Sequence, residues 1–172
     1  MQKEQLNLAS YQIRSLGYSG NEKYRSVLTL VSNKAASSKL KRHARKALID
    51  LDQFITWNKL IADTKVVSEG KSAEVTSYMK MLTVDEFFVQ KLAARAIFHE
   101  QILDQDLLDL AAENLKYLYL KEGLDGEWQD TASWLCKAIG QSGKPTYLDL
   151  LSTVAADSPY RKIQKYARKY GR

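Results

Sequence analysis

The sequence predicts an all-α fold, and three observations lead to this prediction. Apolar residues recur along most of the chain with the 3.6-residue period of helices. Alternating segments of Val, Ile or Thr, which are typical of strands, are nearly absent. The 172 residues include only 2 Pro and 8 Gly, so few positions interrupt a helix. This composition, with 45% hydrophobic residues, also excludes disordered, collagen-like and low-complexity classes.

The periodicity predicts nine or ten helices. The clearest is Ser38–Leu51, where Leu40, Ala44 and Leu48 form part of one apolar stripe. The polar segment Thr64–Lys71 predicts a loop within a single domain. The expected helices are 4–16, 21–33, 38–51, 53–63, 72–82, 85–100, 105–122, 127–139, 144–156 and 159–170.

Three positions predict helix ends. Pro159 follows Asp157 and Ser158, so we expect it at the first helical position of the last helix. Gly17 and Gly140 follow apolar helices, so we expect both in the left-handed conformation that terminates a helix.

An internal repeat is the most specific signal in the chain. Shifting the sequence by 123 residues without a gap aligns Ala9-Ser10-Tyr11 with Ala132-Ser133-Trp134, and Gly17-Tyr18-Ser19-Gly20 with Gly140-Gln141-Ser142-Gly143. The match continues to Ala44-Arg45-Lys46 and Ala167-Arg168-Lys169. The offset is close to three times 41, and helical-hairpin repeats are ~40–47 residues long.

The second copy resembles a HEAT repeat. Tyr147–Pro159 has the spaced leucines and the Asp turn of such a repeat, and Ile163-Gln164-Lys165-Tyr166-Ala167 has the pattern of its second helix. This second-helix pattern also occurs at Leu40-Ala44-Leu48, Val89-Ala93-Ala94-Ile97 and Leu107-Ala111-Ala112-Leu115.

The resemblance implies a HEAT-like (HEAT/armadillo-type) α-α superhelix. We expect a single domain over 1–172 with one continuous core and repeat copies at about 8–49 and 131–171. The HEAT resemblance is loose over 53–127, where helix pairing stays open. The alternative is a generic helical bundle with a duplicated segment.

Charge is distributed unevenly. Residues 23–49 contain eight basic and no acidic residues, and residues 159–172 contain six basic and no acidic residues. Residues 50–158 contain 18 acidic and 10 basic residues. The two basic segments have two interpretations: they form solvated helix faces, or they form a surface that binds an anionic partner.

Motifs for catalysis and metal binding are weak. Cys136 lies in an apolar stretch without a nearby base, so we expect it to be buried. His99-Glu100 is similar to an iron-ligating dyad of HEAT-like deoxyhypusine hydroxylases, but those enzymes need several dyads. Trp134 aligns with Tyr11 and is expected to pack, not to hold a flipped base. We therefore expect no enzyme, no catalytic residue, no metal and no cofactor.

The candidate binding residues are two basic triplets that repeat at the same offset. Each has i, i+3, i+7 spacing, so each lies on one helix face, and the HEAT resemblance implies that these second helices line the concave surface. They are Lys39, Arg42 and Lys46, and Lys162, Lys165 and Lys169. The alternative is that they solubilise the terminal repeats of an array.

These observations favour a non-catalytic scaffold or adaptor that binds another protein or peptide through its concave face or its acidic middle, and an acidic partner is one option. A nucleic-acid or phosphate-binding module is the alternative, and an enzyme on this scaffold is a third class. No apolar run approaches the ~18 residues of a membrane span, so we expect no membrane insertion. We expect a cytoplasmic protein, or a fragment of a longer chain, and the oligomeric state stays open.

Overall fold

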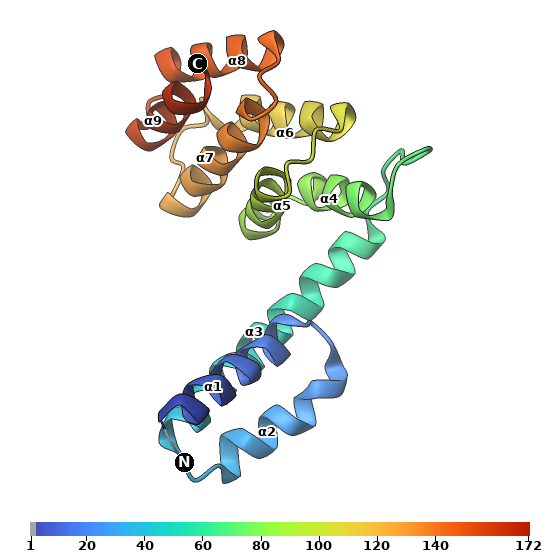
Figure 1. Cartoon of the computed structure of the whole chain (residues 1–172), viewed down its shortest axis with the longest axis vertical. Helices are drawn as coiled ribbons and strands as arrows, with labels where there is room; N and C mark the ends of the chain where they lie inside the picture. The colour runs from blue at the N-terminus through green and yellow to red at the C-terminus, as the bar shows by residue number, and fades with distance from the viewer. Residues whose placement is uncertain (1–2) are drawn as a thin grey trace. The chain divides into compact units, whose positions relative to one another are not determined.

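A computed structural model of the chain describes residues 3–172, in which all regular structure is helical (Figure 1). The all-α class is therefore confirmed. The elements are α1 (Lys3–Tyr18), the 3₁₀ helix η1 (Glu22–Tyr24), α2 (Arg25–Lys34), α3 (Ser38–Asp63), α4 (Ala73–Thr83), α5 (Phe87–His99), α6 (Gln105–Leu118), α7 (Gly126–Gly140), α8 (Pro145–Asp157) and α9 (Arg161–Tyr170). Among these helices of residues 3–172, none has both the length and the apolar character that crossing a membrane requires.

The chain divides into two compact units. The N-terminal unit comprises residues 1–63, described from residue 3, and the C-terminal unit comprises residues 64–172. Their buried apolar side chains form two hydrophobic clusters, one in each unit, where one continuous core was expected. The single repeat domain over 1–172 stays a prediction, and its residues 1 and 2 lie outside the described part.

In the N-terminal unit, α1 and α2 both pack against α3. Leu28, Ala44, Ala47 and Leu51 are fully buried between them. Helices α1 and α3 run in the same direction, because Asn7 contacts Lys39 near their starts while Gly17 lies against Ala47 further along.

Helix α3 is continuous where the sequence predicted two helices, 38–51 and 53–63. The expected break at Asp52 was wrong, because no Gly or Pro interrupts the segment. The Asp52 side chain points outward and accepts from Arg25 at 2.6 Å, so it does not cap a new helix. Its carbonyl also accepts from Thr56 within α3.

In the C-terminal unit, α5, α7 and α9 pack side by side in succession, and α4, α6 and α8 pack against them. Helices α5 and α7 run in the same direction, because Thr131 donates to the Phe87 carbonyl and Gln141 to that of Ile97. This packing is compatible with a helical repeat.

The sequence left helix pairing open in this part of the chain. The second-helix pattern occurs both at Val89–Ile97, in α5, and at Leu107–Leu115, in α6. Helix α6 contacts α4 and α7, and so belongs to the other row from α5. The apolar-Ala-apolar pattern indicates close packing on either side of a hairpin, so it does not distinguish the two rows.

Several hydrogen bonds occur at positions that lie 123 residues apart in the sequence. By sequence, α1, α2 and α3 align with α7, α8 and α9, and three such pairs of bonds have similar lengths. In pairs, these are Ser10 Oγ to Leu6 O and Ser133 Oγ to Gln129 O, both 2.7 Å; Ser19 Oγ to Leu16 O and Ser142 Oγ to Ile139 O, 2.6 and 2.8 Å; and Lys41 N to Ser37 O and Gln164 N to Tyr160 O, 3.1 and 3.0 Å.

The expectation for Gly17 and Gly140 was wrong, since both lie inside helices and neither has a positive φ. The left-handed residues come three positions later, at Gly20 (φ 57°) and Gly143 (φ 63°). Gly17 and Gly140 allow close helix crossings instead. A Cβ on Gly17 would lie 2.6 Å from the Ala47 carbonyl oxygen, and one on Gly140 would lie 2.5 Å from that of Tyr170.

The last helix also starts later than expected. Helix α9 begins at Arg161, after Pro159 and the N-terminal flanking residue Tyr160. Ser158 is buried at the end of α8 and donates to the Tyr119 carbonyl at 3.0 Å. Because Ser158 is held there, Pro159 lies in the turn between α8 and α9.

Candidate functional site

The first basic triplet lies on α3 of the N-terminal unit. Arg42 and Lys46 are exposed, on the side of α3 away from the buried Ala44 and Ala47. Lys39 is half-buried, and its ammonium donates to the amide oxygen of Asn7 on α1 at 2.6 Å. Two of the three cations are therefore available to a ligand, and the third lies at the junction of α1 and α3.

The second triplet lies on α9 of the C-terminal unit, and all three lysines are exposed. Lys162 pairs with Asp130 of α7 at 3.1 Å. Lys165 and Lys169 lie over the rings of Tyr166 and Tyr170, at 5.9 and 5.3 Å from the ring centroids. This row is therefore partly neutralised at Lys162.

Beside each triplet the structure brings together cationic and aromatic side chains that were not among the predicted binding residues. The α1–α3 face consists of Asn7, Ser10, Tyr11, Arg14, Lys39, Arg42, His43 and Lys46. The α7–α9 face consists of Asp130, Ser133, Trp134, Lys137, Lys162, Lys165, Tyr166 and Lys169. Each residue of one face lies 123 positions from its counterpart. The repeat offset would have identified Arg14 and Lys137, since they align with each other.

The α7–α9 face is built around Trp134. The ammonium of Lys137 lies 3.3 Å from the Trp134 ring centroid and 4.8 Å from that of Tyr166. The guanidinium of Arg95, on α5, lies 5.2 Å from the Trp134 ring. Burial lowers the pKa of Lys137, an effect that Asp130 opposes. Cation–π contacts of this kind fix the positions of the cationic groups.

The α1–α3 face is the more strongly cationic of the two. The pKa of His43 is lowered, first by burial and then by the positive charges of Arg42, Lys39 and Arg14. None of these three cations has an ion-pair partner among residues 3–172. A hollow of about 250 Å³ lies between α1 and α3 at this point.

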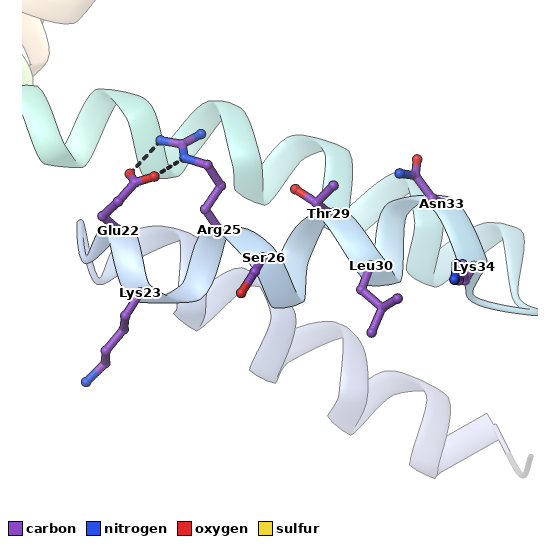
Figure 2. A pocket seen from close by; sticks show the side chains of 8 residues that line it. All are labelled: Glu22, Lys23, Arg25, Ser26, Thr29, Leu30, Asn33 and Lys34. Atoms are coloured by element: carbon purple, nitrogen blue, oxygen red, sulfur yellow. Dashed lines mark hydrogen bonds and ion pairs between the residues drawn. The ribbon is translucent and has the colours of Figure 1, made fainter.

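A second hollow of the N-terminal unit lies along η1 and α2 and is lined by Glu22, Lys23, Arg25, Ser26, Thr29, Leu30, Asn33 and Lys34 (Figure 2). Figure 2 shows Arg25 bonded to Glu22, while Lys23 extends away from both. Arg25 also pairs with Asp52, and its hydrogen bond lowers the pKa of Glu22. The charge of Arg25 is thus balanced within the unit.

Within the acidic middle of the chain, three carboxylates near the start of α6 are engaged in internal contacts. Lys71 pairs with Asp104 at 2.8 Å and with Asp106 at 2.6 Å. Asp109 accepts from Gln105 at 2.9 Å and from Tyr147 at 2.7 Å. These carboxylates already have partners within the C-terminal unit.

The residues considered for chemistry have structural contacts. Cys136 is buried as expected, and burial raises the pKa of its thiol to about 12. Glu100 accepts from the Tyr78 hydroxyl, whereas His99 lies against the ring of Trp134. In the range 3–172, no group of three or more His, Cys, Asp or Glu side chains is placed to hold a metal ion.

Comparisons with protein-family models, with curated proteins and with solved structures give no significant match. The chemistry of the two faces is therefore the basis for a functional proposal.

Proposed function

We propose that this protein is a non-catalytic helical-repeat scaffold that binds an acidic segment of another protein on its α1–α3 and α7–α9 faces. The observation that carries the proposal is the recurrence of a cationic face, at one sequence offset, on equivalent helix pairs. Two equivalent cationic faces suit a linear anionic partner that makes the same contact twice.

The charge balance supports an anionic ligand. Arg42, Lys46, Lys165 and Lys169 have no acidic partner among residues 3–172. The alternative surface, Asp104, Asp106 and Asp109, is already engaged by internal donors. A basic ligand would have to displace those contacts, whereas an acidic ligand on the cationic faces would not.

A HEAT-like architecture is part of this proposal. The side-by-side row of α5, α7 and α9, and the close glycine crossings at equivalent positions, support it. In such arrays one row of helices provides the binding surface. Here α1 and α3, which carry one face, align in sequence with α7 and α9, which carry the other.

A nucleic acid is the second candidate partner, because each face includes an aromatic residue beside the cations. Tyr11 is 71% exposed on the α1–α3 face, and its counterpart Trp134 lies under Lys137. Bases stack on exposed aromatic side chains, with contributions of about 1–3 kcal/mol per base.

The test is a charge reversal on both faces. The variant Arg42→Glu/Lys165→Glu should weaken binding of a fluorescent polyglutamate peptide by about tenfold or more, and wild-type affinity should fall steeply with salt. The matched control Lys34→Glu/Lys116→Glu makes the same change in net charge at exposed positions of α2 and α6. Equal weakening in both variants would show only nonspecific attraction and would refute the proposal.

A single-stranded oligonucleotide distinguishes the two partners. If the partner is a nucleic acid, the oligonucleotide binds more tightly than polyglutamate at equal ionic strength, and Tyr11→Ala weakens its binding. If the partner is an acidic protein segment, Tyr11→Ala has little effect and polyglutamate competes effectively.

A further inference from the structure

The hollow on the α1–α3 face has the composition of an anion site. Arg14 of α1 and Lys39 and His43 of α3 line it, together with Asn7, Ser10 and Tyr11. The α1 residues recur at spacings of three and four, and Lys39 and His43 are four apart. Each group therefore forms one row, facing the other helix. Donors from two helices thus surround a volume of about 250 Å³.

The cationic groups around this hollow are incompletely satisfied. Lys39 donates to the neutral amide of Asn7, and Arg14 donates to the Tyr18 hydroxyl. The Nε of Arg14 is buried and has no hydrogen-bond partner in the described structure. A buried donor without an acceptor destabilises the folded protein. An anion in the hollow would supply both the acceptor and the balancing charge.

The repeat provides an internal comparison. The position of Asn7 corresponds to Asp130 in the C-terminal unit, and that of Lys39 to Lys162. There the Asp130 carboxylate accepts from Lys162 at 3.1 Å and also lies 3.5 Å from Lys91. The C-terminal unit thus carries its own carboxylate where the N-terminal unit has a neutral amide. At this position the lysine of the N-terminal unit therefore meets a neutral amide, and that of the C-terminal unit meets a carboxylate.

We propose that this hollow binds a phosphate monoester, such as a phosphoserine or phosphothreonine of the acidic partner segment. Guanidinium and ammonium groups form strong charge-assisted bonds to phosphate oxygens. The two cations that line the hollow, Arg14 and Lys39, suit a dianion better than the single charge of a phosphodiester. The inference rests on the proposed function, because Lys39 belongs to both the triplet and the hollow.

His43 provides the readout. The charged groups near it are Arg14 from α1, with Lys39 and Arg42 from its own helix, and Tyr11 of α1 also borders the hollow. A bound dianion offsets the three positive charges, so the pKa of His43 should rise on binding. The only other histidine, His99, is in the C-terminal unit and serves as an internal control.

The experiment is an NMR titration of both histidines at constant ionic strength, without ligand and with inorganic phosphate, O-phosphoserine or a phosphoserine peptide. We expect each phosphate compound to raise the pKa of His43 and leave that of His99 unchanged, whereas the unphosphorylated peptide should have a smaller effect. Arg14→Gln should weaken phosphate binding by about tenfold or more.

The decisive variant is Asn7→Asp, which places the repeat's own carboxylate beside Lys39 with little change in volume. The variant should fold and should abolish the response of His43 to added phosphate. The readout is the change in the pKa of His43 when phosphate is added to each variant. The starting pKa values are not compared, because the new carboxylate itself alters the pKa of His43.

Three results would overturn the phosphate monoester site: equal pKa shifts of His43 and His99 on adding phosphate, no pKa shift of His43, or a full response of His43 in Asn7→Asp. A single-stranded oligonucleotide that raises the pKa of His43 as much as phosphoserine does would overturn the choice of a monoester.

The two proposals can fail separately. If polyglutamate binding still depends on Arg42 and Lys165 while phosphate has no effect, only this inference fails. If His43 responds to phosphate while polyglutamate does not bind, only the proposed function fails.

Discussion

At the scale of single residues, two glycines determine how closely helices cross. The Cβ of an alanine at Gly17 would lie 2.6 Å from the Ala47 carbonyl oxygen and 2.9 Å from its Cα, both backbone atoms. At Gly140 it would lie 2.5 Å from the Tyr170 carbonyl oxygen and 2.7 Å from the Tyr170 Cβ. Backbone atoms cannot rotate away as a side chain can, so the helices themselves would have to separate.

Gly17→Ala and Gly140→Ala should therefore each destabilise the protein by about 1–3 kcal/mol, as overpacking does. The control is Gly126→Ala at the start of α7, where a Cβ meets nothing within 4 Å. That change should be neutral or slightly stabilising, by up to about 1 kcal/mol. Urea denaturation followed by circular dichroism measures all three. If Gly126→Ala costs as much as Gly17→Ala, the close crossings are not responsible.

A second residue-scale prediction concerns the hydrogen bonds that hold Asp109. Its pKa is lowered by hydrogen bonds from Gln105 and from the Tyr147 hydroxyl. A carboxyl group with a lowered folded-state pKa adds stability above its unfolded pKa, and this stability is lost as the pH falls through the folded pKa.

Tyr147→Phe removes one donor to Asp109, so it should cost about 1 kcal/mol at neutral pH. The difference from wild type should narrow as the pH falls through the lowered folded-state pKa of Asp109, because the carboxyl then becomes protonated in both proteins. Urea midpoints across a series of pH values from neutral to acid test this. A difference that stays constant with pH would mean that the hydroxyl does not act through Asp109.

At the scale of elements, side-chain caps fix the starts of α6 and α7 in the C-terminal unit. Asp125 precedes α7, and its carboxylate accepts from the backbone N–H groups of Glu127 and Trp128, both at 3.0 Å. Asp104 does the same for α6 with Leu107. Helix α7 contributes Trp134 and Lys137, so the start of this helix helps to position the α7–α9 face.

Asp125→Ala should destabilise the protein by about 1 kcal/mol, because two N–H groups lose their acceptor. Asp125→Ser should recover most of this loss, since its hydroxyl is also a good cap. Thermal denaturation of the two variants compares them directly. Equal stability of the Ala and Ser variants would show that the cap contributes little.

At the scale of the whole molecule, two hydrophobic clusters replace the expected single core. Leu51 is fully buried in the N-terminal cluster and Leu135 in the C-terminal one. Cooperative unfolding units follow contiguous buried packing, so we expect each cluster to support its own unit.

Leu51→Ala should therefore accelerate amide hydrogen exchange over residues 3–63 and leave residues 64–172 largely protected, whereas Leu135→Ala should do the reverse. Each change should cost its unit about 2–5 kcal/mol. Exchange measured by mass spectrometry on the full chain resolves the two ranges. Uniform acceleration across both ranges would instead support the single domain predicted over 1–172.

The sequence by itself determined the helical class, most helix boundaries, the 123-residue repeat and the positions of the two basic triplets. These features depend on local periodicity and on composition, which can be read along a single segment. Tertiary structure decided the rest. Asp52, within α3, pairs with Arg25 from another helix, a contact that no local pattern indicates. The roles of Asn7 and Asp130 likewise depend on which lysine the packing of two helices brings near them. A cation is neutralised only if packing brings an acidic side chain beside it. Because that side chain is often distant in the sequence, only the tertiary structure identifies it.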